Sequence, residues 1–151
     1  MTLTPQLAET VARIGQAALG AAKAWWIIGS AAVVLHGCVL PHVKDVDLMM
    51  SPNDAEALLR RVGGELRNSG ASDRFRSSVF GVWTAPPLPV EVFGGFSVCV
   101  AGTWRELSLS TRQAVTVGGT RVYVPSPEEL VQVLHVFGRP KDLERARLLL
   151  N

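Results

Sequence analysis

From Leu7 to Ala21, apolar residues recur at intervals of three or four, which predicts one amphipathic helix. A Thr-Pro pair at positions 4–5 supplies a capping side chain and a proline suited to the first helical position. Ser-Pro pairs at 51–52 and 126–127 repeat this signal, so we expect helices to begin at both places. The last of these helices should end at Gly138, and a final helix should cover 141–150. The helix after position 51 is expected to bury Leu58, Leu59, Val62 and Leu66.

Short apolar runs bounded by turn-forming residues predict strands between these helices. The expected strands cover residues 24–28, 45–50, 74–83 and 89–93. A Gly-Gly pair at 118–119 separates two alternating runs and predicts a hairpin over 113–124. Ser30 is expected to cap a short helix that runs to about Leu35. Residues 97–109 are ambiguous, with a strand as one interpretation of their start.

The order of these elements determines the expected fold class. Helices and strands alternate first, and further strands and two helices follow, which is typical of an α/β (α+β) domain with a mixed sheet flanked by helices. The chain has 151 residues, a length that fits one domain with a substantial core. We therefore expect a single domain over residues 1–151.

Composition and charge exclude several classes of protein. Hydrophobic residues make up 48% of the chain and charged residues 19%, unlike a disordered chain. A formal net charge of +2 without a basic run makes nucleic-acid binding the least supported function. No apolar stretch matches a membrane span and no signal-peptide pattern is present, so we expect a cytoplasmic protein without a membrane partner. Cys38 and Cys99 fit neither a metal spacing nor a disulfide framework and are expected to be buried free thiols.

Asp45 and Asp47 stand on either side of one valine at the start of a predicted strand. Because strand side chains alternate, both carboxylates should point to the same face, with Cα atoms roughly 6–7 Å apart. Two negative charges at that distance repel unless a cation lies between them, and Mg²⁺ is the natural occupant. The alternative interpretation is an exposed strand end with two solvated acids.

Two further features favour a site over a solvated strand end. Glu91 lies between two valines in a later strand, and two acids on one strand with a third on another are what a two-metal phosphoryl-transfer site needs. Gly29 and Ser30 lie where a strand meets a helix, where glycine permits close backbone approach and free N–H groups can meet phosphate oxygens. Taken alone, this Gly-Ser pair is also compatible with a plain turn.

The stretches "IIGS", "KDVDLMM" and "VEVF" together resemble the nucleotidyltransferase superfamily, which has the polymerase-beta-like fold. The late segment "SPEELVQVLHVFGRPKDLERARLLL" makes the chain similar to small bacterial nucleotidyltransferases of the AbiEii toxin kind, and the match spans roughly residues 26–150. The resemblance implies that Asp45, Asp47 and Glu91 bind Mg²⁺, with Mn²⁺ as a substitute, and carry the catalysis. It also implies that Gly29 and Ser30 hold the triphosphate.

The chain departs from the family pattern at three places. Relatives often carry an arginine and a threonine just before the first aspartate, where this sequence has Pro41 and Val43. They also tend to place a lysine late in the chain, where this sequence has Leu134. These changes remove contacts that would serve a triphosphate and leave the metal-binding acids intact.

Two functional hypotheses follow from the resemblance. The first is a Mg²⁺-dependent nucleotidyltransferase that moves a nucleoside monophosphate from a nucleoside triphosphate to an acceptor hydroxyl. The acceptor can be a small molecule, a protein or an RNA, and the sequence does not determine the oligomeric state. The second is a protein of the same fold that binds a nucleotide or a protein partner without turnover.

A few other polar residues have two interpretations each. His36 is expected to be structural, and His42 is either a plain loop residue or part of the cleft wall. Arg139, Lys141 and Asp142 either form a solvated helix start or reach the site.

Overall fold

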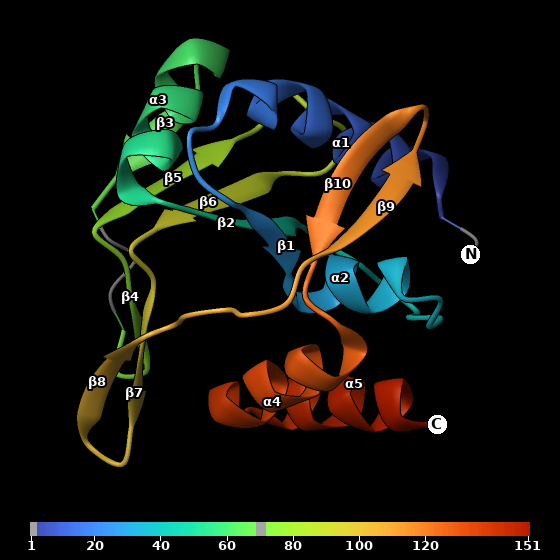
Figure 1. Cartoon of the computed structure of the whole chain (residues 1–151), viewed down its shortest axis with the longest axis vertical. Helices are drawn as coiled ribbons and strands as arrows, with labels where there is room; N and C mark the ends of the chain where they lie inside the picture. Colours follow the sequence, from blue (N-terminus) through green and yellow to red (C-terminus); the bar gives the residue numbers. More distant parts are fainter. Residues whose placement is uncertain (1–2, 69–71) are drawn as a thin grey trace.

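The computed structural model describes residues 3–68 and 72–151, and Figure 1 shows the arrangement of its elements. The helices are α1 (Pro5–Ala17), α2 (Gly29–Leu35), α3 (Pro52–Val62), α4 (Pro127–Phe137) and α5 (Pro140–Leu150), with a 3-10 turn, η1 (Ala18–Gly20), after α1. The strands are β1 (Trp26–Ile28), β2 (Val46–Met50), β3 (Glu65–Arg67), β4 (Phe75–Arg76), β5 (Val79–Trp83), β6 (Val90–Gly94), β7 (Ser97–Val100), β8 (Thr103–Glu106), β9 (Gln113–Val117) and β10 (Thr120–Val124).

The main sheet has five strands in the order β1-β2-β6-β5-β3. The β2 and β6 strands are parallel, and the other neighbours are antiparallel. Helices α1 and α3 lie on one side of this sheet, and α4 and α5 lie on the other (Figure 1). The predicted α/β (α+β) domain with a mixed sheet flanked by helices is therefore confirmed.

The pairing register assigns the side chains of the main sheet to two different faces. Leu48 in β2 pairs with Val92 in β6, and both belong to the large aliphatic core that also contains the buried faces of α1 and α3. Asp47 pairs with Glu91 in β6 and with Ile28 in β1. Because alternate residues of a strand point in opposite directions, this second row lies on the opposite face, toward α4.

The three predicted helix starts are confirmed. In each, a hydroxyl accepts a hydrogen bond at 3.1–3.2 Å from the backbone N–H three residues later, and a proline follows the cap. Such caps satisfy N–H groups that have no partner inside the helix. The capping residues are Thr4, Ser51 and Ser126. The predicted end of α4 at Gly138 and the hairpin at 113–124 are also confirmed.

Three local predictions are wrong. Ser30 does not cap α2, because the helix already begins at Gly29 and no side chain caps its start. Leu66 does not continue the buried face of α3, because Gly63 ends that helix with a φ of 73° and Leu66 lies in the edge strand β3. Residues 74–83 form two strands rather than one, since β4 pairs with β7 while β5 pairs with β6. An alternating pattern does not reveal that a chain changes its pairing partner.

The ambiguous segment 97–109 contains the paired strands β7 and β8, which form a three-stranded sheet with β4. Both cysteines are free and half-buried. In the part of the chain that the structure describes, no helix combines the length and the apolar character needed to cross a membrane.

Candidate active site

Three carboxylates from two neighbouring strands converge on the face of the main sheet opposite the large aliphatic core. Asp47 lies in β2, Asp45 directly precedes that strand, and Glu91 lies in β6 opposite Asp47. One oxygen from each carboxylate lies within 4.8 Å of the other two, and all three residues are half-buried. The structure thus brings together the three acids that the sequence singles out.

Burial and mutual repulsion raise the pKa of two of these carboxyls. The pKa of Asp47 is raised well above its ordinary value, first by burial and then by the negative charges of Asp45 and Glu91. The pKa of Glu91 is also raised, again first by burial and then by the charge of Asp45. A side-chain hydrogen bond between Asp47 and Glu91 favours the protonated form of Asp47. Such a cluster favours any cation, a proton or a metal ion, that reduces the repulsion.

The donor set and its spacing fit a hard divalent cation. Mg²⁺ binds carboxylate oxygens at about 2.0–2.1 Å, so two oxygens on opposite sides of one ion are about 4 Å apart. Oxygens separated by no more than 4.8 Å need only small side-chain rotations to reach a shared ion. Asp45, Asp47 and Glu91 are therefore the residues that would hold such a metal.

The junction between β1 and α2 lies directly against Asp47. Gly29 has a φ of 70°, which favours glycine. A Cβ atom on Gly29 would also come within 2.5 Å of Asp47 Oδ2, so a larger residue would displace the carboxylate. Ser30 follows at the first turn of α2 and is 7% exposed. Gly29, one of the two residues that the sequence assigns to phosphate binding, thus adjoins Asp47, and Ser30 follows it directly in the chain.

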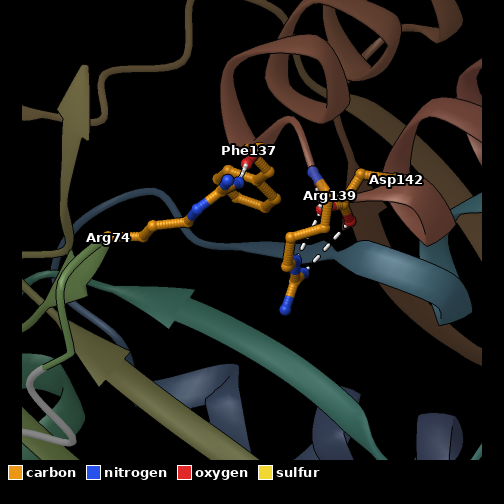
Figure 2. A network of polar contacts seen from close by, with 4 residues as sticks. All are labelled: Arg74, Phe137, Arg139 and Asp142. Carbon is orange, nitrogen blue, oxygen red and sulfur yellow. Dashed lines mark hydrogen bonds and ion pairs between the residues drawn. The ribbon is translucent and has the colours of Figure 1, made fainter. Parts of the chain in front are cut away.

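Arg139, at the start of α5, brings a positive charge to the acids, since it lines the same cavity as Asp47 and Glu91. Its Nε and Nη2 atoms donate to the two oxygens of the fully buried Asp142, at 2.6 and 3.1 Å. Arg74 donates to the carbonyl oxygen of Phe137 at 2.6 Å, beside this pair (Figure 2). The charge of Arg139 lowers the pKa of Asp47, against the larger effects of burial and repulsion. Arg139 therefore reaches the site, and Asp142 holds it there.

Two further cations act on Glu91. Lys141 in α5 and Arg67 in β3 both lower its pKa and so offset part of the repulsion. The sequence offers Lys141 as a candidate but gives no signal for Arg67, because β3 is not predicted. The histidines lie elsewhere: His36 Nε2 is 2.7 Å from the carbonyl oxygen of Pro125, and His42 lines a separate apolar groove.

A cavity of about 260 Å³ opens beside Asp47 and Glu91. The chain contains five phenylalanines, and all five line this cavity together with Ser77 and Arg139. Sequence reasoning missed this feature, because the rings come from β4, β5, β6, the residues after β6 and the end of α4. Their positions are Phe75, Phe80, Phe93, Phe96 and Phe137.

Comparisons with known proteins bear on the fold. No family model matches the chain, and no curated protein matches it. A candidate nucleotidyltransferase of Thermotoga maritima superposes with a TM-score of 0.78 at 24% identity, over 99% of this chain and 96% of its own. A nucleotidyltransferase-like antigenic protein of Paracoccidioides brasiliensis superposes with a TM-score of 0.62 at 17% identity, over 97% of this chain and 76% of its own. The antibiotic-resistance factor ANT(2″)-Ia, in complex with adenylyl-2″-tobramycin, gives 0.56 at 17% identity, over 97% and 88%.

These likenesses show that the chain has the nucleotidyltransferase fold. They confirm the architecture that the sequence resemblance implies, over nearly the whole chain.

Proposed function

We propose that the protein is a Mg²⁺-dependent nucleotidyltransferase that transfers a nucleoside monophosphate from a nucleoside triphosphate to an acceptor hydroxyl. One observation carries this proposal: three carboxylates from two strands of a nucleotidyltransferase fold meet beside a glycine turn that touches one of them. Two similar structures, ANT(2″)-Ia with adenylyl-2″-tobramycin and the lincosamide antibiotic adenylyltransferase LnuA with lincomycin, have this fold and bind small molecules.

The residues of the site divide into two groups by their place in the sheet. Asp45 and Asp47 would hold the metal that accompanies the triphosphate, and Gly29 and Ser30 would contact the phosphates through their backbone N–H groups. Glu91 approaches from the neighbouring strand. A bound divalent metal would neutralise phosphate charge and stabilise the attacking and leaving oxygens.

The raised pKa of Glu91 suits it to accept a proton. In the transfer, the acceptor oxygen bonds to the α-phosphorus. The bond from that phosphorus to the oxygen shared with the β-phosphorus breaks. The electron pair leaves with pyrophosphate, and the acceptor proton passes to the Glu91 carboxylate. This role requires Glu91 to be ionised when the acceptor binds, which a cation beside it favours.

The cations near the acids offset the departures from the family pattern. Pro41 and Val43 remove polar contacts that relatives often have before the first aspartate. Arg139 and Lys141, at the start of α5, supply positive charge to the same cluster. We propose that Arg139 contacts the nucleotide, since its Nη1 amino group is not used in the ion pair with Asp142.

The test is pyrophosphate release from each of the four ribonucleoside triphosphates, with Mg²⁺ or Mn²⁺, with and without a heat-treated cell extract as a source of acceptors. We expect release that chelation by EDTA abolishes. The double variant Asp45→Asn/Asp47→Asn should be inactive, while Glu56→Gln, an exposed acid on α3, should retain activity. Release that persists in the double variant would contradict the proposal.

A second candidate is a protein that binds nucleotides without turnover, which the residues at Pro41 and Val43 favour. It predicts that Mg²⁺ with a nucleoside triphosphate raises the melting temperature while pyrophosphate release stays at background. The closer likeness to the AbiEii toxin kind, and with it a toxin–antitoxin role, stays a prediction, since the solved structures bear on the fold alone.

A further inference from the structure

We propose that the phenylalanine-lined cavity beside Glu91 is the acceptor subsite, and that the acceptor is a compact alcohol with an apolar or aromatic body. This inference rests on the proposed function, because an acceptor is required only if nucleotide transfer occurs. It names the chemical class of a substrate that the sequence leaves undetermined.

The apolar part of the cavity wall consists of Ile28 and of five aromatic rings, and these rings contact one another. Neighbouring ring centroids lie 5.2–5.9 Å apart, in stacked, tilted and edge-to-face arrangements. Phe96 and Phe137 are each 6% exposed, whereas Phe75, Phe80 and Phe93 are only half-buried. The half-buried rings present apolar surface that a bound aromatic or aliphatic group would cover.

The strand order places the cavity on the acceptor side of the acids. In the sequence of strands β1-β2-β6-β5, the Gly29 turn follows β1, Asp47 lies in β2, Glu91 in β6 and Phe80 in β5. In an in-line transfer, the attacking oxygen approaches the phosphorus opposite the leaving pyrophosphate. If the phosphates extend toward Gly29, the attacking hydroxyl comes from beyond Glu91, where the rings lie.

The size and the polar groups of the cavity restrict the acceptor further. At about 260 Å³ it falls below the range of roughly 300–1,000 Å³ that holds drug-sized ligands, so it suits a compact body. Among the described residues, Asp47 and Glu91 are the only acids in its lining, so a polycationic acceptor would find no further counter-charges. Ser77 lines the cavity at 7% exposure, and no hydrogen bond within the described residues occupies its hydroxyl. It is free to orient a polar atom of the acceptor.

The chain offers a direct test of occupancy, because every phenylalanine lines the cavity. Protein labelled with ¹³C in the phenylalanine rings is titrated with 2-phenylethanol and followed by nuclear magnetic resonance. We expect saturable shifts of the ring signals, with a dissociation constant on the order of 1 mM for so small a ligand. Kanamycin, a polycationic sugar, and glucose, a polar one, should leave the ring signals unchanged.

Two variants locate the binding. The ring centroids of Phe80 and Phe93 lie 5.3 Å apart, and Phe80 is half-buried. Phe80→Ala should therefore weaken 2-phenylethanol binding about tenfold. Phe80→Leu keeps an apolar side chain, so it tests the loss of the ring even if Phe80→Ala fails to fold. Trp104→Ala removes a half-buried ring in β8, outside the cavity, and should leave binding unchanged. Equal binding by wild type and both Phe80 variants would overturn the proposal.

The nucleobase is the competing occupant. If adenosine or another nucleoside shifts the ring signals and displaces 2-phenylethanol, the cavity takes the base and the proposal is overturned. Ring shifts by kanamycin or glucose, or none by 2-phenylethanol, overturn it as well.

We expect radiolabel to pass from the α-phosphate of a nucleoside triphosphate to 2-phenylethanol in the presence of Mg²⁺.

The failure of the proposed function gives a different pattern. A protein that responds to Mg²⁺ and nucleoside triphosphates but does not bind 2-phenylethanol retains the transferase proposal and loses the acceptor class. A protein that binds 2-phenylethanol but shows no nucleotide response and no pyrophosphate release loses the transferase proposal, and the acceptor assignment falls with it.

Discussion

Two groups of acids in this small domain differ in what surrounds them. Glu129 at the start of α4 accepts hydrogen bonds from the backbone and hydroxyl groups of Ser110 and Thr111, including two backbone N–H groups at 2.8 Å. Asp54 in α3 accepts two backbone N–H groups at 3.0 Å. Partial burial alone would raise the pKa of both carboxyls, but these hydrogen bonds outweigh it and the pKa values are lowered.

Asp47 and Glu91 have the opposite character. Burial and the nearby negative charges raise the pKa of each, and the hydrogen bond between the two side chains requires a proton. Acids that receive donors stabilise the fold, whereas acids that face other acids destabilise the metal-free fold. The cluster therefore destabilises the metal-free fold, and a bound cation would reduce this repulsion.

The largest expected effect concerns Glu91→Gln, which keeps the size of the side chain and removes its charge. If Glu91 accepts the acceptor proton, turnover should fall by about 10²–10⁴-fold while nucleotide affinity changes little. Pyrophosphate release and nucleotide affinity are measured on the same variant. Unchanged turnover would remove Glu91 from the mechanism, and affinity lost in step with turnover would make it an ordinary metal ligand.

A smaller effect is expected when the divalent cation and the nucleotide are added. A ligand that binds only the folded state stabilises it by about 2.7 kcal/mol at a concentration 100 times its dissociation constant. For a domain of this size, Mg²⁺ with the preferred nucleoside triphosphate should raise the melting temperature by roughly 5–10 °C. Asp47→Asn should abolish this shift. The absence of any shift with all four ribonucleotides, with either Mg²⁺ or Mn²⁺, would count against both transfer and binding.

Removing an acid that accepts hydrogen bonds, such as Glu129, should lower the stability of the fold, unlike removing an acid of the Asp47–Glu91 cluster. Glu129→Ala deletes the acceptor of several hydrogen bonds and should lower the free energy of unfolding by about 1–3 kcal/mol. Glu128→Ala is the matched control, since it removes an exposed acid from the same first helical turn. Urea unfolding curves of the two variants measure the difference, and equal losses would assign the effect to the helix dipole instead.

The smallest effect is a reversal of sign between Asp47→Asn and Asp54→Asn in metal-free protein. The first removes repulsion and should leave stability unchanged or raise it by up to about 1 kcal/mol, while the second removes an acceptor and should lower it by about 1 kcal/mol. If Asp47→Asn unfolds the protein, Asp47 is a structural residue and the metal site loses its main support.

The pH dependence of stability separates the same two variants. Because the pKa of Asp47 is raised in the folded state, the folded protein binds more protons than the unfolded chain above the ordinary carboxyl pKa of about 4. Stability of the metal-free protein is therefore lost as pH rises through the raised pKa, and Asp47→Asn should flatten this loss. For Asp54, with its lowered pKa, stability is present above the ordinary value and is lost as pH falls. Unfolding free energies measured across this range, with and without each variant, test both signs.

The helix starts, the hairpin and the three acids of the site could be predicted from the order of the amino acids. These depend on short-range chemistry: a hydroxyl three residues before an N–H, a glycine pair between alternating runs, and acids at alternate positions of a strand. Gly29 was also predicted to belong to the site. The physical reason for a glycine there is visible only in the fold, where a Cβ atom would collide with Asp47. Ser30 as a helix cap was wrong, because the backbone enters α2 one residue earlier.

The surroundings of the acids could not be predicted, because they depend on contacts between distant parts of the folded chain. Arg67 lies near Glu91 because the unpredicted strand β3 pairs at the edge of the main sheet, and Arg139 reaches Asp47 because buried Asp142 holds its guanidinium. The five phenylalanines are dispersed along the chain and meet only through strand pairing and the packing of α4. No local pattern encodes such a meeting, since spacing along the sequence specifies which face a residue occupies and only the folded chain specifies which residues share that face.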